Sequence, residues 1–203
     1  MEKSRLTLVV VATVVWAALP AVLGIGLATT VGLPALSVLL VVGVVALDGG
    51  TVKPLLKPNP KHLALGLGAG VVMTAVTYPA YLLVAHLYPP LSGAVALAQQ
   101  PLEQVDPLAY LPRMLVVIVA EELVFRGAWL GRHQSRRLGL FAWGAYVLAQ
   151  VGMGTWIVAA LAAACGACWL LLRLRTHGLW APLVAHLVWS PTVLLFLPVT
   201  SFA

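Results

Sequence analysis

Residues 108–130 read LAYLPRMLVVIVAEELVFRGAWL, an apolar run that contains two adjacent glutamates, Glu121 and Glu122, and Arg126 four residues after the second. An ionisable residue at the centre of a membrane helix costs about 2.5–3.5 kcal/mol on the insertion scale. We therefore expect these three side chains to face the protein interior or a wet cavity rather than lipid. Ionisable residues inside a membrane helix indicate a functional site.

The whole chain has the composition of a membrane protein. It has 203 residues, of which 62% are hydrophobic and 9% are charged, and its mean hydropathy is +1.01. This composition excludes a soluble domain and predicts an all-α, polytopic transmembrane helical bundle. A transmembrane barrel would show alternating segments of about ten residues, whereas these apolar runs are continuous and longer.

Apolar runs predict seven spans, at residues 6–27, 31–47, 63–88, 108–130, 138–152, 155–174 and 179–200. The second and fifth runs are short for a span. The first follows a basic start but is longer than the apolar part of a signal peptide, so we expect it to be an uncleaved span. The prediction is a single membrane domain over residues 1–203, with accessory spans at 6–88 and a catalytic core at 108–195.

The basic residues support this layout. If the N-terminus is cytoplasmic, ten of the twelve basic residues lie on the cytoplasmic side: Lys3, Arg5, Lys53, Lys57, Lys61, Arg132, Arg136, Arg137, Arg173 and Arg175. The loop at 89–107, on the other side, contains Glu103 and Asp106 and no Lys or Arg. This is the positive-inside pattern, and we expect an integral protein of the bacterial inner (cytoplasmic) membrane. The net charge of +6 therefore reflects topology, and no nucleic-acid partner is expected.

The same topology brings polar residues from three spans to a similar depth. At about 1.5 Å per helical residue, Glu121 lies roughly 15 Å from the cytoplasmic end of its span, His186 roughly 10 Å and Gln150 roughly 18 Å. The sequence therefore predicts a single polar site within the bundle, in a layer somewhat nearer the cytoplasm.

Helical spacing divides the roles of the two glutamates. Glu122 and Arg126 are four residues apart and can pair on one helix face, whereas Glu121 points about 100° away. We therefore expect Glu121 to be left free for water and suited to general acid/base catalysis. The alternative is a purely structural Glu–Arg clamp, which explains Glu122 and Arg126 but not Glu121.

Two further pairs have the same spacing. His186 and Ser190 can donate hydrogen bonds to a developing oxyanion, although such residues also make ordinary helix–helix contacts in membranes. Tyr146 and Gln150 form the other pair. Gln150 can position a water or a substrate carbonyl but cannot act as a base.

Other motifs indicate packing. Cys165 and Cys168 lie in an apolar run and are interpreted as inert thiols among small residues, and Gly66-x-x-x-Gly70 indicates close helix packing. No zinc-ligand motif occurs, and no cofactor is expected. A metal held by Glu121, Glu122 and His186 remains an alternative.

The motif Glu121-Glu122-x-x-x-Arg126 resembles the EExxxR motif of the CPBP family, which includes the CAAX prenyl endopeptidases and bacterial immunity-type relatives. The segment RTHGLWAP at 175–182, followed by His186, is similar to the connection into that family's last motif. The resemblance covers residues 108–195. It implies a glutamic-type intramembrane endopeptidase in which Glu121 is the base and His186 stabilises the oxyanion.

Two positions depart from the family pattern. FxxxH is replaced by Tyr146-x-x-x-Gln150, and HxxxN by His186-x-x-x-Ser190. Either Glu121 works with Gln150 as a neutral partner, or the chain belongs to a divergent, myxosortase-like subgroup, or it is inactive.

The resemblance implies that the substrate is a membrane-embedded or lipidated protein. It would be cleaved at a C-terminal signal, either a lipidated CAAX-like end or the hydrophobic tail of a surface-sorting signal. A second hypothesis is an inactive scaffold or immunity protein that binds partners through the same polar cavity. A third is a small proton-coupled transporter, although no duplicated half is visible.

Overall fold

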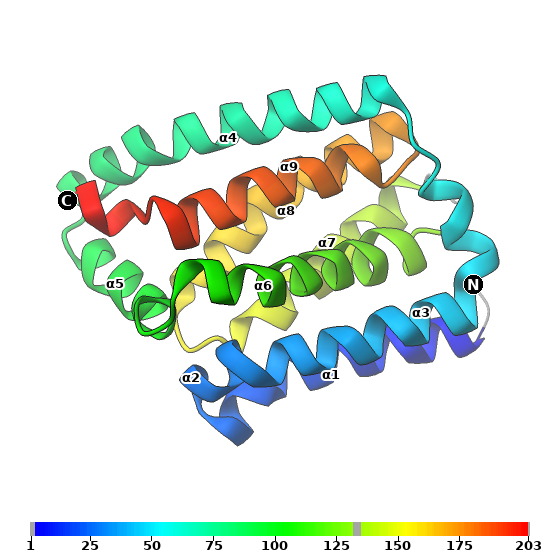
Figure 1. Ribbon diagram of the computed structural model, residues 1–203, viewed down its shortest axis with the longest axis horizontal. Coiled ribbons are helices and arrows are strands. Elements are labelled where there is room, and N and C mark those ends of the chain that lie inside the picture. The colour runs from blue at the N-terminus through cyan, green and yellow to red at the C-terminus, as the bar shows by residue number, and fades with distance from the viewer. Residues whose placement is uncertain (1–2, 132–134, 203) are drawn as a thin grey trace.

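The computed structural model describes residues 3–131 and 135–202, and the regular structure in these residues is helical. The long helices share one approximate axis, and the two termini lie at opposite ends of the bundle (Figure 1). The elements are, in chain order, α1 (Lys3–Leu23), α2 (Ile25–Leu27), η1 (Ala28–Gly32), α3 (Leu33–Leu55), α4 (Pro60–Leu87), α5 (Pro90–Glu103), α6 (Pro107–Glu121), η2 (Glu122–Ala128), α7 (Arg136–Val151), α8 (Trp156–Thr176), α9 (Trp180–Pro191), η3 (Thr192–Phe196) and η4 (Val199–Phe202). The all-α prediction is confirmed.

Each of the seven predicted apolar runs is helical, but two predicted boundaries are wrong. The run at 31–47 belongs to a longer helical stretch, Ile25–Leu55, which continues past a kink at Asp48 (φ −135°, ψ 16°). The loop predicted at 89–107 contains helix α5. This helix buries Leu91 and Val95 and exposes both the apolar Leu97 and the polar Gln100 and Glu103. Because its residues are partly apolar and partly polar, the sequence did not predict a membrane span here.

Four helical stretches in the described residues are long and apolar enough to cross a membrane: Leu6–Leu23, Ile25–Leu55, Pro60–Leu87 and Trp156–Thr176. A shorter apolar helix covers Trp180–Phe196. Together with the composition, these helices make the chain an integral membrane protein. The count of seven spans remains a prediction.

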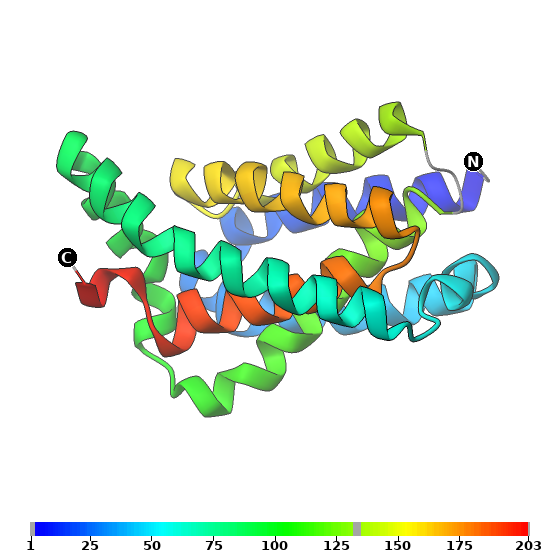
Figure 2. The same ribbon diagram turned by 90° about the horizontal axis from the view of Figure 1, so that it is seen from above.

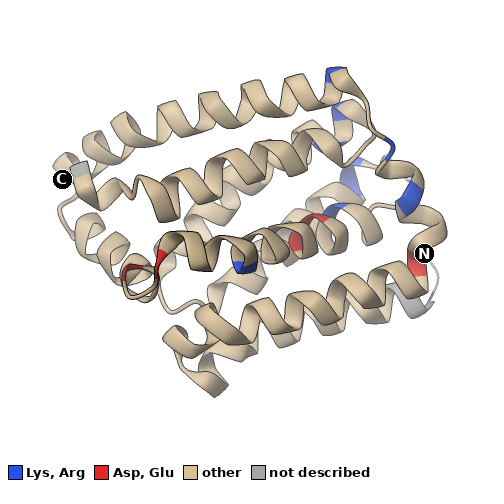
Figure 3. Ribbon diagram, in the orientation of Figure 1, with Lys and Arg blue, Asp and Glu red and all other residues tan. Residues whose placement is uncertain are grey.

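Charged residues separate along the bundle axis. Figure 3 shows most Lys and Arg gathered at the end where the N-terminus lies, which is called the basic end; Arg113, an exposed residue on α6, is an exception. Glu103 and Asp106 flank the connection between α5 and α6 at the opposite end. Arg132, one of the ten predicted cytoplasmic residues, falls outside the described part of the chain.

Local signals in the sequence fix where several helices begin. Asn59 precedes Pro60, and its side-chain oxygen accepts a hydrogen bond from the Lys61 backbone N–H at 2.9 Å. Asp106 precedes Pro107 and accepts from the Ala109 N–H at 2.7 Å. Both are N-cap residues followed by proline at the first helical position. The start of α6 is thus defined by its own sequence, and with it the depth of Glu121, the fifteenth residue of the helix.

Helix α9 is held closely against α4 by Gly66 and Gly70. These two helices lie side by side in both views (Figures 1 and 2). A Cβ at Gly66 would lie 2.5 Å from the Ala181 carbonyl oxygen, and a Cβ at Gly70 would lie 2.7 Å from Val188 Cβ. The small-residue face predicted from the sequence therefore allows α9, which carries His186, to approach α4.

Gly66→Ala and Gly70→Ala are each expected to destabilise the protein by about 1–3 kcal/mol, because the added methyl overlaps α9. Gly68→Ala is the matched control, since a Cβ at Gly68 would have no atom within 4 Å. Thermal unfolding in detergent measures the difference. Equal unfolding midpoints for all three variants would contradict the close packing.

Candidate active site

The two glutamates lie at the junction between two kinds of helix. Glu121 is the last residue of α6, and Glu122 is the first residue of the π-helical segment η2. In η2 the Trp129 backbone N–H donates to the Val124 carbonyl five residues earlier, at 3.0 Å. Both glutamates are buried, with exposed fractions of 5% and 1%. Short π segments inside helices occur frequently at functional sites.

Glu122 is the centre of a buried polar cluster. Its Oε1 accepts a hydrogen bond from Arg126 Nη1 at 2.8 Å and lies 2.9 Å from His186 Nδ1. The predicted Glu122–Arg126 pair is therefore present. Because a carboxylate paired with Arg is ionised and only accepts hydrogen bonds, Nδ1 is assigned as the protonated ring nitrogen. His186 Nε2 then faces Glu121 Oε2, at 3.5 Å.

Glu121 is held by residues from α7. Gln150 Nε2 donates to Glu121 Oε1 at 2.7 Å, and the Tyr146 hydroxyl donates to Oε2 at 3.4 Å. The expected convergence of Glu121, Gln150 and His186 in one layer is thus present. The expectation that Glu121 is left free was wrong, because both of its oxygens have protein neighbours.

Trp169 supports this cluster and was missed in the sequence. Its ring stacks on His186 with centroids 3.6 Å apart and an interplanar angle of 18°. The Arg126 guanidinium lies 4.6 Å from the Tyr146 ring centroid and 5.4 Å from that of Trp169. In an apolar run Trp169 looks like an ordinary core residue, and no signal in the sequence separates it from the other tryptophans.

Gly166 provides the space for these rings. A Cβ at Gly166 would lie 2.9 Å from the Tyr146 ring and 3.4 Å from Arg126 Nη2. The Gly166 carbonyl also accepts a hydrogen bond from Arg126 Nη2 at 3.5 Å. A side chain at this position of α8 would therefore push apart the groups that neutralise Glu122.

Arg173 has a different role from the one predicted. It was counted among the cytoplasmic charges, but it lies within α8 and is fully buried. Its Nε donates to the Arg126 carbonyl at 3.1 Å, and its Nη2 donates to the Gly131 carbonyl at 2.7 Å. Carbonyls at the end of a helix lack partners within the helix and attract cations. Arg173 thus caps the segment that contains the glutamates.

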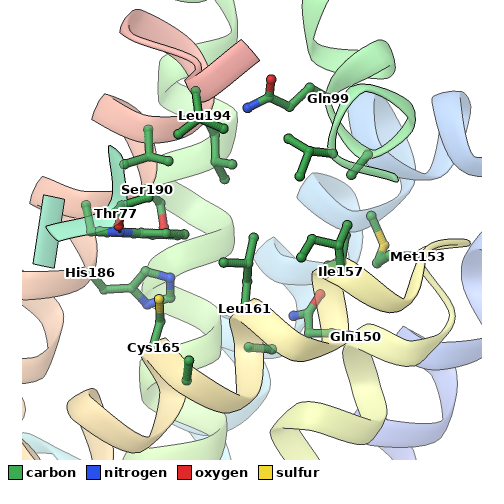
Figure 4. Close-up of a pocket in the computed structure, with 18 of the residues that line it drawn as sticks. Thr77, Gln99, Gln150, Met153, Ile157, Leu161, Cys165, His186, Ser190 and Leu194 are labelled. Carbon is green, nitrogen blue, oxygen red and sulfur yellow. The ribbon is translucent and has the colours of Figure 1, made fainter. Parts of the chain in front are cut away.

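One face of the cluster borders a cavity of about 690 Å³. Most of its wall is apolar. Figure 4 shows His186, Ser190, Cys165 and Gln150 around it, and Ser190 lies one helical turn beyond His186 on α9. The polar residues of the predicted site that line it are Glu121, Tyr146, Gln150, His186 and Ser190. Glu122 and Arg126 lie behind this wall.

Cys165 and Cys168 are unpaired cysteines that line the same cavity; Cys165 is buried and Cys168 is exposed. In residues 3–131 and 135–202, no group of three His, Cys, Asp or Glu has an arrangement suited to hold a metal ion. His186 contacts both Glu121 and Glu122 directly.

Residues 103–191 match the family model described as type II CAAX prenyl endopeptidase Rce1-like. This part of the chain is an Rce1-like domain. The match supports the assignment to the CPBP family and includes Glu121, Glu122, Arg126, Gln150 and His186. Because the Rce1-like family is a protease family, the match supports a CAAX-type intramembrane protease activity in general. No curated protein and no solved structure matches the chain.

Arg173→Met is expected to destabilise the protein by about 2–4 kcal/mol, because two buried carbonyls lose a charged donor. Arg175→Met is the matched control: it removes a charge from the same turn of α8, where Arg175 is exposed, and is expected to change stability by less than about 0.5 kcal/mol. Chemical or thermal unfolding in detergent measures both. Similar losses of stability in the two variants would show that the hydrogen bonds of Arg173 contribute no more than its positive charge does.

Proposed function

We propose that the protein is a glutamic-type intramembrane endopeptidase of the bacterial inner membrane that cleaves membrane-associated C-terminal signal segments. The observation that supports this most is the position of Glu121. Its carboxylate borders an apolar cavity between Gln150 and His186, and His186 is in turn held by the Glu122–Arg126 pair. Glu121 can act as the general base, and His186, which Glu122 orients, is a second proton acceptor beside it. This arrangement suits hydrolysis.

Catalysis begins with a water molecule in the cavity beside Glu121. Glu121 Oε2 takes one proton from the water while the water oxygen bonds to the scissile carbonyl carbon. The carbonyl electron pair moves to its oxygen and gives a tetrahedral oxyanion. The proton then passes to the amide nitrogen, the C–N bond breaks, and the products are a new carboxyl terminus and an amine.

The arrangement of His186 suggests a role in moving this proton. Its Nδ1 donates to the ionised Glu122, so its neutral Nε2 is an acceptor directed at Glu121 Oε2. The same carboxylate–imidazole order orients the histidine of serine protease triads. Once Nε2 receives a proton from Glu121, it becomes a donor toward the oxyanion or the leaving nitrogen. The oxyanion role predicted for His186 therefore requires this protonated form.

Hydroxyl groups on two walls of the cavity supply further donors. Tyr146 lies beside Glu121 on α7, and Ser190 lies one turn from His186 on α9. Donors in a water-poor site stabilise developing charge more strongly than they would in bulk water. We assign Tyr146 and Ser190 to the oxyanion and Gln150 to holding Glu121 in position.

An inactive scaffold or immunity protein is the second candidate. The observation that favours it is Gln150, an amide at the position where the family motif has histidine and a group that cannot accept a proton. The two candidates differ in what they require of Glu121. A peptidase needs its carboxylate as a proton acceptor, whereas a scaffold needs only a side chain of the same shape.

Glu121→Gln is expected to lower the cleavage rate by a factor of about 100 to 10,000, because the amide cannot take a proton from water. The assay uses the purified protein in vesicles with a reporter that ends in an apolar C-terminal segment. Glu103→Gln is the matched control, since Glu103 is an exposed acid on α5, and it should retain full activity. Unchanged cleavage in Glu121→Gln, with an unfolding midpoint equal to the parent's, would favour the scaffold.

Gln150→Leu is expected to lower the rate about 10-fold to 100-fold, the equivalent of one hydrogen bond to a charged group. Gln150→His offers a ring N–H at the same position, so it should be more active than Gln150→Leu. Single-turnover cleavage of the same reporter measures both variants. A Gln150→Leu variant as fast as the parent would contradict the assigned role of the Gln150 amide.

A further inference from the structure

The cavity extends from Glu121 toward only one end of the bundle. On α6 its lining residues run from Tyr110 to Glu121, and on α9 and η3 they run from His186 to Leu194. On α8 they run from Trp156 to Trp169. In each case these residues lie toward the end that holds Glu103 and Asp106, away from the basic end (Figure 3).

The side of the site toward the basic end is filled. Glu122, Phe125 and Arg126 follow Glu121 along η2 and are at most 2% exposed, and Leu130 and Arg173 pack there with no exposed surface. Among the described residues that line the cavity, none comes from 122–131 or 170–176. A peptide end approaching from the basic side therefore meets packed side chains rather than Glu121.

The cavity opens sideways between α4 and α8. Val72, Val76 and Val84 on α4 line it and are also exposed on the outer surface, with Val72 61% and Val76 57% exposed. Ala164 and Cys168 on α8 are likewise both lining and exposed. Side chains that face both the cavity and the exterior mark its mouth. The lining residues of α5, by contrast, are buried or half-buried, so α5 covers the end of the cavity.

The distribution of charge identifies the leaflet. The exposed cations Lys57, Lys61, Arg136, Arg137 and Arg175 lie toward the basic end, which the positive-inside rule assigns to the cytoplasm. The mouth residues on α4 run from the middle of the helix at Val72 toward its C-terminal end at Val84, and Ala164 and Cys168 lie near the middle of α8. The mouth therefore opens to lipid from the middle of the bundle toward the outer leaflet.

We propose that the substrate is an apolar C-terminal tail that spans the membrane with its folded domain outside and its C-terminus in the cytoplasm, and that it enters through this mouth. This inference rests on the proposed peptidase function and selects among its substrates. In such a protein the outer half of the tail directly follows the folded domain, so cleavage there separates the domain from its anchor. A lipidated CAAX-like end, which lies at the cytoplasmic surface, is on the closed side.

The experiment compares two reporters with the same apolar tail in vesicles that contain the purified protein. The first has its folded domain outside and a basic cytoplasmic end, and the second has its folded domain inside. The orientation of the protein itself is read by a membrane-impermeant maleimide in a variant with both cysteines replaced by alanine. In that variant Gln104→Cys should be labelled from outside and Lys57→Cys from inside; both positions are exposed.

Val76→Trp tests the route of entry, because the indole would block the mouth; we expect cleavage of the first reporter to fall at least tenfold. Val71→Trp is the matched control: it lies on the same helix and is 53% exposed, but it does not line the cavity. It should stay within twofold of the parent. Equal effects of the two substitutions would overturn entry between α4 and α8.

Binding is measured separately from cleavage by a photocrosslinking residue at position 76 in the Glu121→Gln variant. Capture and Glu121-dependent cleavage of the first reporter alone would support the inference. Glu121-dependent cleavage of the second reporter at an equal or higher rate, or labelling of Gln104→Cys from inside, would overturn it and leave the peptidase function intact. Capture of the first reporter without cleavage by the parent would overturn the peptidase function instead.

Discussion

The neutralisation of the Glu122 carboxylate is the constraint on which the site depends. A buried charge in an apolar bundle is tolerated only when it is paired and hydrogen-bonded, and Glu122 Oε1 meets both Arg126 and His186. Those contacts tie η2 to α9. Arg173 extends the network to α8 through the Arg126 carbonyl, and Gly66 and Gly70 let α9 approach α4. Helices far apart in sequence are thus positioned around one buried anion.

In this arrangement two adjacent residues differ in role: Glu122 has a structural role, and Glu121 is the residue placed for chemistry. Glu122 lies behind the cavity wall, where its Oε1 contacts both Arg126 and His186. Glu121 forms part of the wall, between a neutral amide and an imidazole. Few polar groups compete with these contacts in an apolar cavity, so electrostatic interactions there are stronger than they would be in water. A carboxylate at this position has the surroundings that base catalysis requires.

Much of the fold could be predicted from the sequence, and so could most of the residues that form the site. The i,i+4 spacing gave the Glu122–Arg126 pair, and counting helical rise along three spans brought Glu121, Gln150 and His186 into one layer. The π segment at Glu122 could not be predicted, because it depends on packing around the helix rather than on local preference. Trp169 and Arg173 were missed or assigned to the wrong environment for a related reason. Their partners are a ring and backbone carbonyls from other helices, which leave no periodic signal.

The direction in which the cavity opens follows from how the charges are neutralised. Arg126 lies one turn beyond Glu122 toward the basic end, and Arg173 binds the carbonyls at that end of the same segment. The side chains that stabilise the glutamates therefore fill the side of the site that faces the cytoplasm under the positive-inside rule. Only the opposite side of Glu121 remains for a substrate. Charge pairing at the motif thus leaves space on one side of Glu121, and in the proposed function a substrate reaches Glu121 from the outer half of the membrane.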